Sequence, residues 1–397
     1  MTRADVQVDD FTIAIDDGVL ADLRDRLRRT RWPSGLHGTG WERGTDLDEL
    51  RELCAYWADG FDWRAQETLL NELSQVIVEV DGLATHAVHV PSPEPDAIPL
   101  ILTHGWPSTF AEFRNVVGPL SNPAAHGGDP RQAFHVVCPS IPGYGFSAAP
   151  REPGWDVRRV ARHLGELMTA LGYDRFAAQG GDWGAMASHL MALDIPERVI
   201  GLHLNLVLVY PPDSPDAMEG LTENELARAN RFAAMNAGGG INYAMLQGMS
   251  PHTLSPALSD SPAGLASWLT EKFRNWTQND GRVADAMSWD ELLTHLTIYW
   301  VTNSIGSSIE LYLESTRTGT MGPPPARVEV PTGGALFPYE MLAPARKWAE
   351  PLFNIVRWTE FEGGGHFPSI ERPTEFVEDV RAFFAPLRAG TPEHRGG

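Results

Sequence analysis

Asp182 lies in the middle of a Gly-x-Asp-x-Gly sequence flanked by Gly180 and Gly184, between an apolar run at 176–178 and a helix-like segment at 185–193. Small residues at the flanking positions permit a very tight turn from strand to helix, which exposes the central side chain at the C-terminal edge of a sheet. The helix that starts behind this side chain presents free N–H groups, which favour an ionised carboxylate. The spacing therefore predicts a carboxylate nucleophile, although Gly-Gly-Asp also occurs in ordinary loop turns.

An aspartate at this turn limits the chemistry that the site can perform. A carboxylate that attacks a saturated carbon forms an ester, which water can then cleave at the protein's own carbonyl carbon. A serine in the same place would form an ether with such a carbon, and the reaction would stop there. The residue type thus indicates substrates with an electrophilic sp³ carbon, namely epoxides or alkyl halides.

A histidine that activates water should follow the nucleophile in the chain and lie in a loop after a late strand. His366 meets this condition, and it directly follows the glycine run 363–365. The glycines allow the backbone to bend sharply and to bring the imidazole beside Asp182. Of the other downstream histidines, His189 is expected to face packing contacts and His394 lies in the tail.

The acid that orients this histidine is expected at the end of the preceding strand. Glu340, the last residue of a Phe-Pro-Tyr-Glu sequence, occupies that place. Glu360 and Glu362 are alternatives, but they belong to the strand and the loop that deliver His366. We favour Glu340, whose carboxylate would orient the imidazole and stabilise its protonated form.

The backbone N–H groups of Trp106 and Trp183 are predicted to form an oxyanion hole beside Asp182. Trp106 lies in a His-Gly-Trp-Pro sequence directly after the apolar strand 100–103, and Trp183 follows the aspartate in the chain. The two tryptophan side chains are also expected to form an apolar wall of the site. His104, which opens the His-Gly-Trp-Pro sequence, is expected to be a hydrogen-bonded structural residue rather than a base.

The composition excludes several classes of partner. The chain has 397 residues and a net charge of −21, with no cluster of basic residues beyond 24–31. This charge balance argues against binding to nucleic acid or to an anionic membrane, since both require a basic surface. Two cysteines, Cys54 and Cys138, cannot build a disulfide framework, and we expect buried thiols. No apolar run is long enough for a membrane span or a secretion signal, so a cytoplasmic protein is expected.

Strands and helices alternate along much of the chain, which predicts an α/β fold with a mostly parallel sheet and helices on both faces. Residues 1–75 are expected to form helices, with one short strand at 11–15, that pack on the sheet domain. Further strands are predicted at 76–80, 85–90, 100–103, 134–138, 176–178, 199–209, 327–330 and 353–358.

The strand pattern stops after residue 209 and resumes near residue 327. Between these points the sequence predicts helices at 223–236, 262–275 and 290–313, and a helical insertion here would cover the active site as a cap. The predicted division is an N-terminal helical extension at 1–75, an α/β-hydrolase core at 76–209 and 326–388, a helical cap at 210–325 and a disordered tail at 389–397.

Taken together, five motifs resemble those of the microsomal-type epoxide hydrolase family, and the resemblance extends over nearly the whole chain, residues 8–388. These motifs are His104-Gly105-Trp106-Pro107, Pro142-Gly143-Tyr144-Gly145-Phe146-Ser147, Gly180-Gly181-Asp182-Trp183-Gly184, Phe337-Pro338-Tyr339-Glu340 and Gly364-Gly365-His366-Phe367. The resemblance implies an α/β-hydrolase fold, a small-molecule epoxide substrate, and no metal or cofactor. It does not extend to the membrane anchor of animal members, so no membrane attachment is expected.

The resemblance also implies two tyrosines in the cap that hold the epoxide oxygen. On the matching positions these are Tyr243 and Tyr312. Opening an epoxide generates an alkoxide, which is a poor leaving group unless a hydrogen-bond donor supports it, and two phenols can do so at neutral pH. Without the resemblance, each tyrosine would more often be a core aromatic residue on an amphipathic helix.

The sequence thus predicts an epoxide hydrolase that forms a covalent ester on Asp182 and releases a vicinal diol. Soluble members of this kind are typical of bacteria, and some act in natural-product pathways, so the resemblance allows a biosynthetic context beside detoxification. A haloalkane dehalogenase and a non-catalytic ligand receptor remain as alternatives, and a homodimer is the candidate oligomer. The predicted substrate contacts are Trp106, Trp183, Met245 and Phe367.

Overall fold

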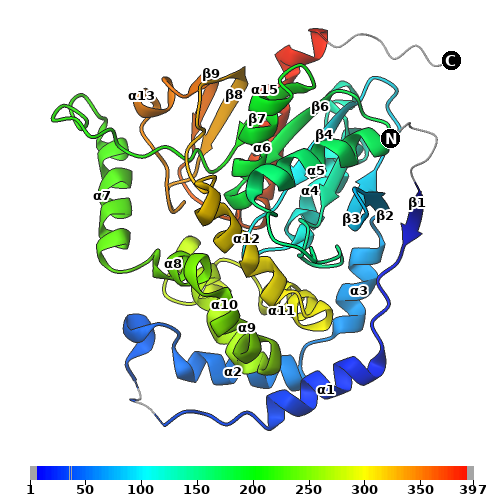
Figure 1. Cartoon of the computed structure of the whole chain (residues 1–397), viewed down its shortest axis with the longest axis vertical. Coiled ribbons are helices and arrows are strands. Elements are labelled where there is room, and N and C mark those ends of the chain that lie inside the picture. Colours follow the sequence, from blue (N-terminus) through cyan, green and yellow to red (C-terminus); the bar gives the residue numbers. More distant parts are fainter. Residues whose placement is uncertain (1–6, 35, 37, 391–397) are drawn as a thin grey trace.

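The computed structural model describes residues 7–34, 36 and 38–390 (Figure 1). A nine-stranded sheet forms the centre of this part of the chain, in the order β1-β2-β3-β5-β4-β6-β7-β8-β9. The strands are β1 (Val8–Phe11), β2 (Gln75–Val80), β3 (Leu83–Val90), β4 (Ile98–Thr103), β5 (Phe134–Pro139), β6 (Phe176–Gly180), β7 (Val199–Leu204), β8 (Val328–Leu336) and β9 (Phe353–Glu360). From β5 to β9 all neighbours are parallel, whereas β1, β2 and β3 add antiparallel strands at one side.

Helices flank this sheet and complete the layered arrangement that the sequence predicts. The helices are α1 (Asp17–Arg28), α2 (Leu47–Asp59), α3 (Trp63–Asn71), α4 (Arg114–Ser121), α5 (Val157–Ala170), α6 (Asp182–Asp194), α7 (Glu223–Ala237), α8 (Asn242–Met249), α9 (Pro251–Asp260), α10 (Pro262–Trp276), α11 (Trp289–Thr302), α12 (Ile305–Thr318), α13 (Arg346–Ala349), α14 (Pro368–Glu371) and α15 (Pro373–Phe384). Helices α5 and α6 pack as one pair, and α4 and α15 form the other. Every residue of β4, β6 and β7 is buried, as expected for central parallel strands.

The cap consists of helices between β7 and β8, and α8 to α12 gather at one end of the sheet (Figure 1). Capping boxes at Thr222 and Ser288 stabilise the starts of α7 and α11. The predicted helix 290–313 is wrong, because α11 and α12 are separate helices. Asn303 ends α11 in the left-handed conformation, with φ of 50°, and asparagine tolerates this conformation better than most residues.

The N-terminal helices pack on the cap rather than on the sheet. Helices α1 and α2 run along the outer side of α9 and α10, and α3 lies against α11 (Figure 1). Buried Trp57 on α2 donates its indole N–H to Thr297 Oγ1 on α11 at 2.9 Å. This region also contacts the sheet domain, because β1 pairs with β2 and Gln66 on α3 accepts a hydrogen bond from Arg114 on α4 at 3.1 Å.

Three strands differ by more than two residues from their predictions. β1 covers Val8–Phe11, whereas the sequence predicts a strand at 11–15. β7 ends at Leu204, so that 205–209 leave the sheet and pass along the site. β8 is longer than predicted and includes Gly333 and Gly334, which weakened the strand signal. A Cβ on Gly333 would lie 2.7 Å from the Phe383 ring, so glycine is required there by close packing of α15. Residues 391–397 of the predicted disordered tail lie outside the described residues.

Candidate active site

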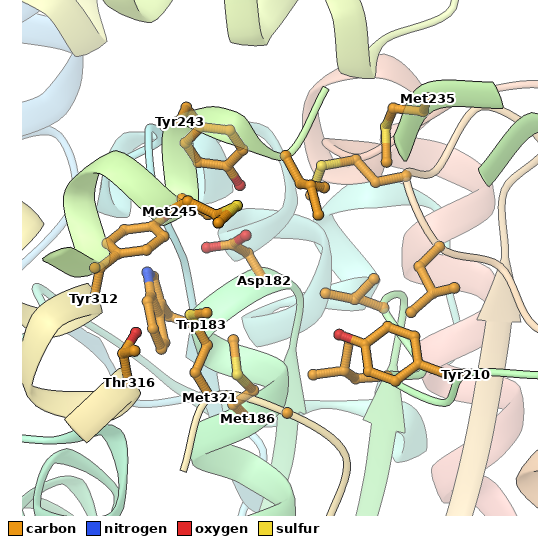
Figure 2. A pocket seen from close by; sticks show the side chains of 18 of the residues that line it. Asp182, Trp183, Met186, Tyr210, Met235, Tyr243, Met245, Tyr312, Thr316 and Met321 are labelled. Carbon is orange, nitrogen blue, oxygen red and sulfur yellow. The ribbon is translucent and has the colours of Figure 1, made fainter. Parts of the chain in front are cut away.

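Asp182 lies at the junction of β6 and α6, where the chain turns without a connecting loop. Its φ of 50° places it in the left-handed region, which is uncommon for a residue other than glycine. A Cβ on Gly180 would lie 2.3 Å from the Gly184 backbone, and a Cβ on Gly184 would lie 1.8 Å from the Thr103 carbonyl oxygen. Both flanking glycines are therefore required by the turn, which directs the Asp182 side chain into a cavity (Figure 2).

The loop after β4 supports this carboxylate. The Trp106 N–H donates a hydrogen bond to Asp182 Oδ1 at 2.8 Å, as the predicted oxyanion hole requires. A Cβ on Gly105 would lie 2.2 Å from the same oxygen, so glycine allows the loop to approach so closely. Trp183, whose backbone N–H is the other donor predicted for the oxyanion hole, is the second residue of α6. Its ring forms part of the cavity wall.

His366 lies between two carboxylates. Its Nδ1 is 2.6 Å from Glu340 Oε1, and its Nε2 is 3.6 Å from Asp182 Oδ2. All three side chains are buried, with residue exposures of 4%, 2% and 7% for His366, Glu340 and Asp182. The structure thus brings together the aspartate, histidine and glutamate predicted from the sequence, although they lie far apart in the chain.

The alternatives to these residues have other partners. Glu360 forms an ion pair with Arg228 of the cap, at 2.9 Å. His104 is fully buried, and its Nε2 accepts a hydrogen bond from the Ile141 N–H at 3.3 Å. His189 is buried on α6 and packs against Phe353, as expected for a structural residue.

Burial and charge act in opposite directions on the His366 imidazole. Burial alone lowers its pKa, because a charged ring loses hydration. The negative charges of Glu340 and Asp182 and their hydrogen bonds outweigh burial and raise the pKa of His366 to about 10. At neutral pH the imidazole is therefore protonated.

Two tyrosines from the cap lie above Asp182. Tyr243 on α8 and Tyr312 on α12 have ring centroids 6.0 Å apart. Tyr243 stacks on Trp106 at 5.3 Å, and Tyr312 meets the Trp183 ring edge-on at 4.7 Å. Figure 2 shows the Tyr243 hydroxyl pointing toward the Asp182 carboxylate. Burial, together with the Asp182 charge, raises the pKa of both phenols well above the usual value, so both remain hydrogen-bond donors at neutral pH.

The cavity at this site has a volume of about 300 Å³ and extends from Asp182 between the cap and the sheet (Figure 2). Its polar side chains are few, and methionine, leucine and aromatic residues form most of the wall. Of the predicted substrate contacts, Trp183 and Met245 line the cavity, whereas Trp106 and Phe367 pack beside the triad. The sequence interpretation missed several lining residues, namely Leu206, Leu208, Tyr210, Phe232, Met235, Met321, Met341 and Leu342.

Metal-ligating residues do not cluster in the part of the chain that the structure describes: no group of three or more histidine, cysteine, aspartate or glutamate side chains is placed to hold an ion. Both Cys54 and Cys138 are buried free thiols, as predicted. Among the described helices, none combines the length and the apolar character needed to cross a bilayer.

Removing the charge of Asp182 is expected to lower the pKa of His366 from about 10, because one of the two carboxylates that stabilise the imidazolium is lost. Asp182→Asn is the suitable change, since the amide keeps the shape of the side chain. Titration of the imidazole by NMR in both proteins measures the difference. An unchanged pKa in Asp182→Asn would contradict the electrostatic coupling of these two groups.

Comparisons with known proteins agree with this geometry. The family model for the epoxide hydrolase N terminus matches residues 8–113, and the model for the alpha/beta hydrolase fold matches residues 98–373. A Stigmatella aurantiaca protein named "Putative epoxide hydrolase" is 39% identical over 381 residues, which cover 96% of this chain and 85% of that protein. Epoxide hydrolase 1 of Sus scrofa is 34% identical over 410 residues, covering 96% of this chain and 90% of that protein.

A solved structure extends the likeness to three dimensions. The crystal structure of juvenile hormone epoxide hydrolase from the silkworm Bombyx mori superposes with a TM-score of 0.87 at 27% identity, covering 97% of this chain and 96% of that one. These matches confirm both the predicted fold and the resemblance inferred from the five motifs. The chain therefore belongs to the epoxide hydrolase family and is an enzyme with the α/β-hydrolase fold.

Proposed function

We propose that the enzyme converts an apolar epoxide into a vicinal diol through a covalent ester on Asp182. The observation that carries this proposal is the position of the Asp182 carboxylate, with the Trp106 N–H at 2.8 Å, His366 Nε2 at 3.6 Å and two phenols above it. A carboxylate so placed can attack a carbon atom in the cavity, and the groups around it can serve both steps of an ester mechanism.

In the first step, an Asp182 oxygen attacks one epoxide carbon and the carbon–oxygen bond of the ring breaks. The departing oxygen takes a proton from Tyr243 or Tyr312 and becomes the first hydroxyl of the diol. The phenol regains its proton from the His366 imidazolium. Ester formation removes the negative charge of Asp182, which lowers the pKa of His366 and favours this release. The products of the step are a neutral ester and a neutral imidazole.

In the second step, His366 takes a proton from water, and the resulting hydroxide attacks the Asp182 carbonyl carbon. The Trp106 N–H stabilises the oxyanion that forms, because it already binds an oxygen of this carboxylate. When the intermediate collapses, the bond between this carbon and the ester oxygen breaks, and that oxygen, which came from Asp182, leaves with the substrate. The leaving alkoxide takes the proton from the new carboxylic acid and becomes the second hydroxyl, which restores the carboxylate and the imidazolium.

Replacing either cap tyrosine by phenylalanine is expected to slow ester formation about 10- to 100-fold, and the double replacement is expected to slow it more. The physical reason is the loss of a proton donor to the departing oxygen. Stopped-flow measurement of ester formation tests this expectation. Tyr299→Phe is the matched control, because Tyr299 is an equally buried tyrosine whose hydroxyl donates to the Ser108 carbonyl oxygen at 3.2 Å instead.

The same variants separate the proposal from its alternatives. A haloalkane dehalogenase would release halide from chloroalkanes or bromoalkanes at a rate that Tyr243→Phe and Tyr312→Phe leave unchanged. A ligand receptor would bind epoxides tightly without turnover. The proposal extends to a role in bacterial natural-product biosynthesis. A higher kcat/KM for bulky natural-product epoxides than for styrene-oxide-like substrates would support that role.

A further inference from the structure

The loop that carries His366 is attached to the cap at the C-terminal end of α10. The His366 N–H donates to the Trp276 carbonyl oxygen at 2.8 Å. A Cβ on Gly365 would lie 2.4 Å from that oxygen and 3.0 Å from Thr277 Cα. The glycines before His366 therefore allow two backbones to pass in direct contact, and the position of the imidazole depends on the end of α10.

Gln278, two residues beyond α10, joins the same loop through its side chain. Its Oε1 accepts hydrogen bonds from the Gly364 N–H at 2.8 Å and from Arg372 Nη2 at 3.1 Å. A Cβ on Gly363 would lie 2.8 Å from this oxygen. One amide oxygen of the cap thus holds the loop before His366 and the residue that follows α14.

Glu371 completes the connection from the other side. Its Oε2 accepts the Gln278 N–H at 2.9 Å, and its Oε1 accepts the Phe367 N–H at 3.1 Å. We call Gln278, Gly364, Glu371 and Arg372 the α10 clasp. The chain before His366 is therefore bonded directly to Gln278 at Gly364, and the chain after it is connected to Gln278 through Glu371 at Phe367.

The core holds His366 from the opposite direction. Asn205, directly after β7, donates its side-chain N–H to the His366 carbonyl oxygen at 3.4 Å. The core thus binds the carbonyl group of His366, and α10 binds its N–H. The Trp276 ring, at the end of the same helix, lies 5.1 Å from the His366 ring and 5.2 Å from the Tyr243 ring.

We propose that Gln278 is a positioning residue for the hydrolysis of the ester, an inference that depends on the proposed function. By holding the loop against α10, Gln278 keeps His366 Nε2 directed at Asp182. A misplacement of about 1 Å in a catalytic group can cost about 100-fold in rate. Opening of the epoxide depends on Asp182 and on tyrosines of α8 and α12, which lie outside the α10 clasp, and His366 returns the phenol proton only after the ring has opened. Loss of the clasp therefore slows the second step selectively.

Two substitutions of Gln278 test this role. Gln278→Met keeps the length of the side chain and removes the acceptor, whereas Gln278→Glu keeps an oxygen acceptor for both donors. In single-turnover experiments with an epoxide that the wild type converts, ester formation is expected to change less than about threefold in both variants. Hydrolysis of the ester is expected to be about 30-fold slower in Gln278→Met, and Gln278→Glu is expected to restore it to within about threefold of the wild type.

Controls separate positioning from general stability. Arg228→Met breaks another contact between cap and core, the ion pair with Glu360 at 2.9 Å, and is expected to leave ester hydrolysis unchanged. Arg372→Met removes one donor to Gln278 and is expected to slow hydrolysis of the ester selectively, by less than about 30-fold, so it tests the clasp if Gln278→Met does not fold.

Two outcomes would overturn the inference. In one, Gln278→Met hydrolyses the ester at the wild-type rate; in the other, both steps slow equally and Gln278→Glu restores neither. Either result leaves the proposed function intact as long as the wild type forms the ester. A wild type that forms no ester on Asp182 during turnover would instead contradict the proposed function, and the inference with it.

Discussion

Asp182→Asn is expected to lower kcat by about 10⁴-fold or more, because the reaction loses its nucleophile. An amide attacks a saturated carbon far more slowly than a carboxylate does, while its oxygen can still accept the hydrogen bond that the Trp106 N–H makes at 2.8 Å. Asparagine also tolerates the left-handed conformation of this position, with φ of 50°. We therefore expect a folded protein that binds epoxides and does not turn them over.

The measurement is the steady-state rate of diol formation by purified Asp182→Asn, with the melting temperature as a control for folding. Intact mass must be recorded beside each assay, since conversion of the asparagine to aspartate would restore activity and add about one dalton. A variant that retains the amide and more than about one hundredth of the wild-type rate would contradict the role of Asp182 as nucleophile.

His366→Gln is expected to stop the reaction at the ester. Epoxide opening requires the Asp182 carboxylate and a proton from a tyrosine, whereas attack by water requires a base at the position of His366 Nε2, 3.6 Å from Asp182 Oδ2. Loss of a general base typically costs 10²- to 10⁴-fold. We expect the hydrolysis of the ester to slow by about 10³-fold and the ester to accumulate.

Mass spectrometry of His366→Gln after mixing with excess epoxide tests this expectation. The protein mass should rise by the mass of one substrate molecule, and a peptide containing Asp182 should carry the addition. Glu340→Gln is a useful comparison. In the wild type, Glu340 Oε1 lies 2.6 Å from His366 Nδ1, and the glutamine keeps a hydrogen-bond partner for this nitrogen but removes the negative charge. A His366→Gln protein that turns over without any mass addition would contradict the role of His366 in hydrolysis.

The triad could be predicted from the sequence because each member belongs to a local pattern. The tight turn at Asp182 requires glycine at fixed positions, since a Cβ at either flanking site would overlap backbone atoms. Gly365, directly before His366, is required for a related reason, the close passage of the backbone at the end of α10. Close backbone contacts of this kind allow only glycine at the position concerned, so the glycine pattern that they require can be recognised in a single sequence.

The cap was predicted less accurately, because its helices carry weak or misleading local signals. Helix α8 follows a run of three glycines, and α9 contains Pro256 in its interior, so neither was predicted. The break between α11 and α12 falls at Thr302-Asn303-Ser304, a short polar run that a helix can also contain, and depends on the left-handed conformation of Asn303. Such a break is determined by tertiary packing rather than by periodicity.

The substrate cavity depends on contacts between distant segments, which no local pattern reveals. Leu206 and Leu208 follow a strand that was predicted to extend through them, and Met341 and Leu342 come from the loop after Glu340. Phe232 and Met235 reach the cavity from α7. A single sequence shows that these residues are apolar, but only the fold brings them to one wall.

A single turnover in water enriched in ¹⁸O tests the covalent mechanism most directly. With enzyme in excess over epoxide, we expect the label to enter the Asp182 carboxylate, because water attacks its carbonyl carbon, and the first diol released to contain no label. If the diol carries the label after one turnover and Asp182 does not, water attacks the epoxide itself and the covalent ester is excluded.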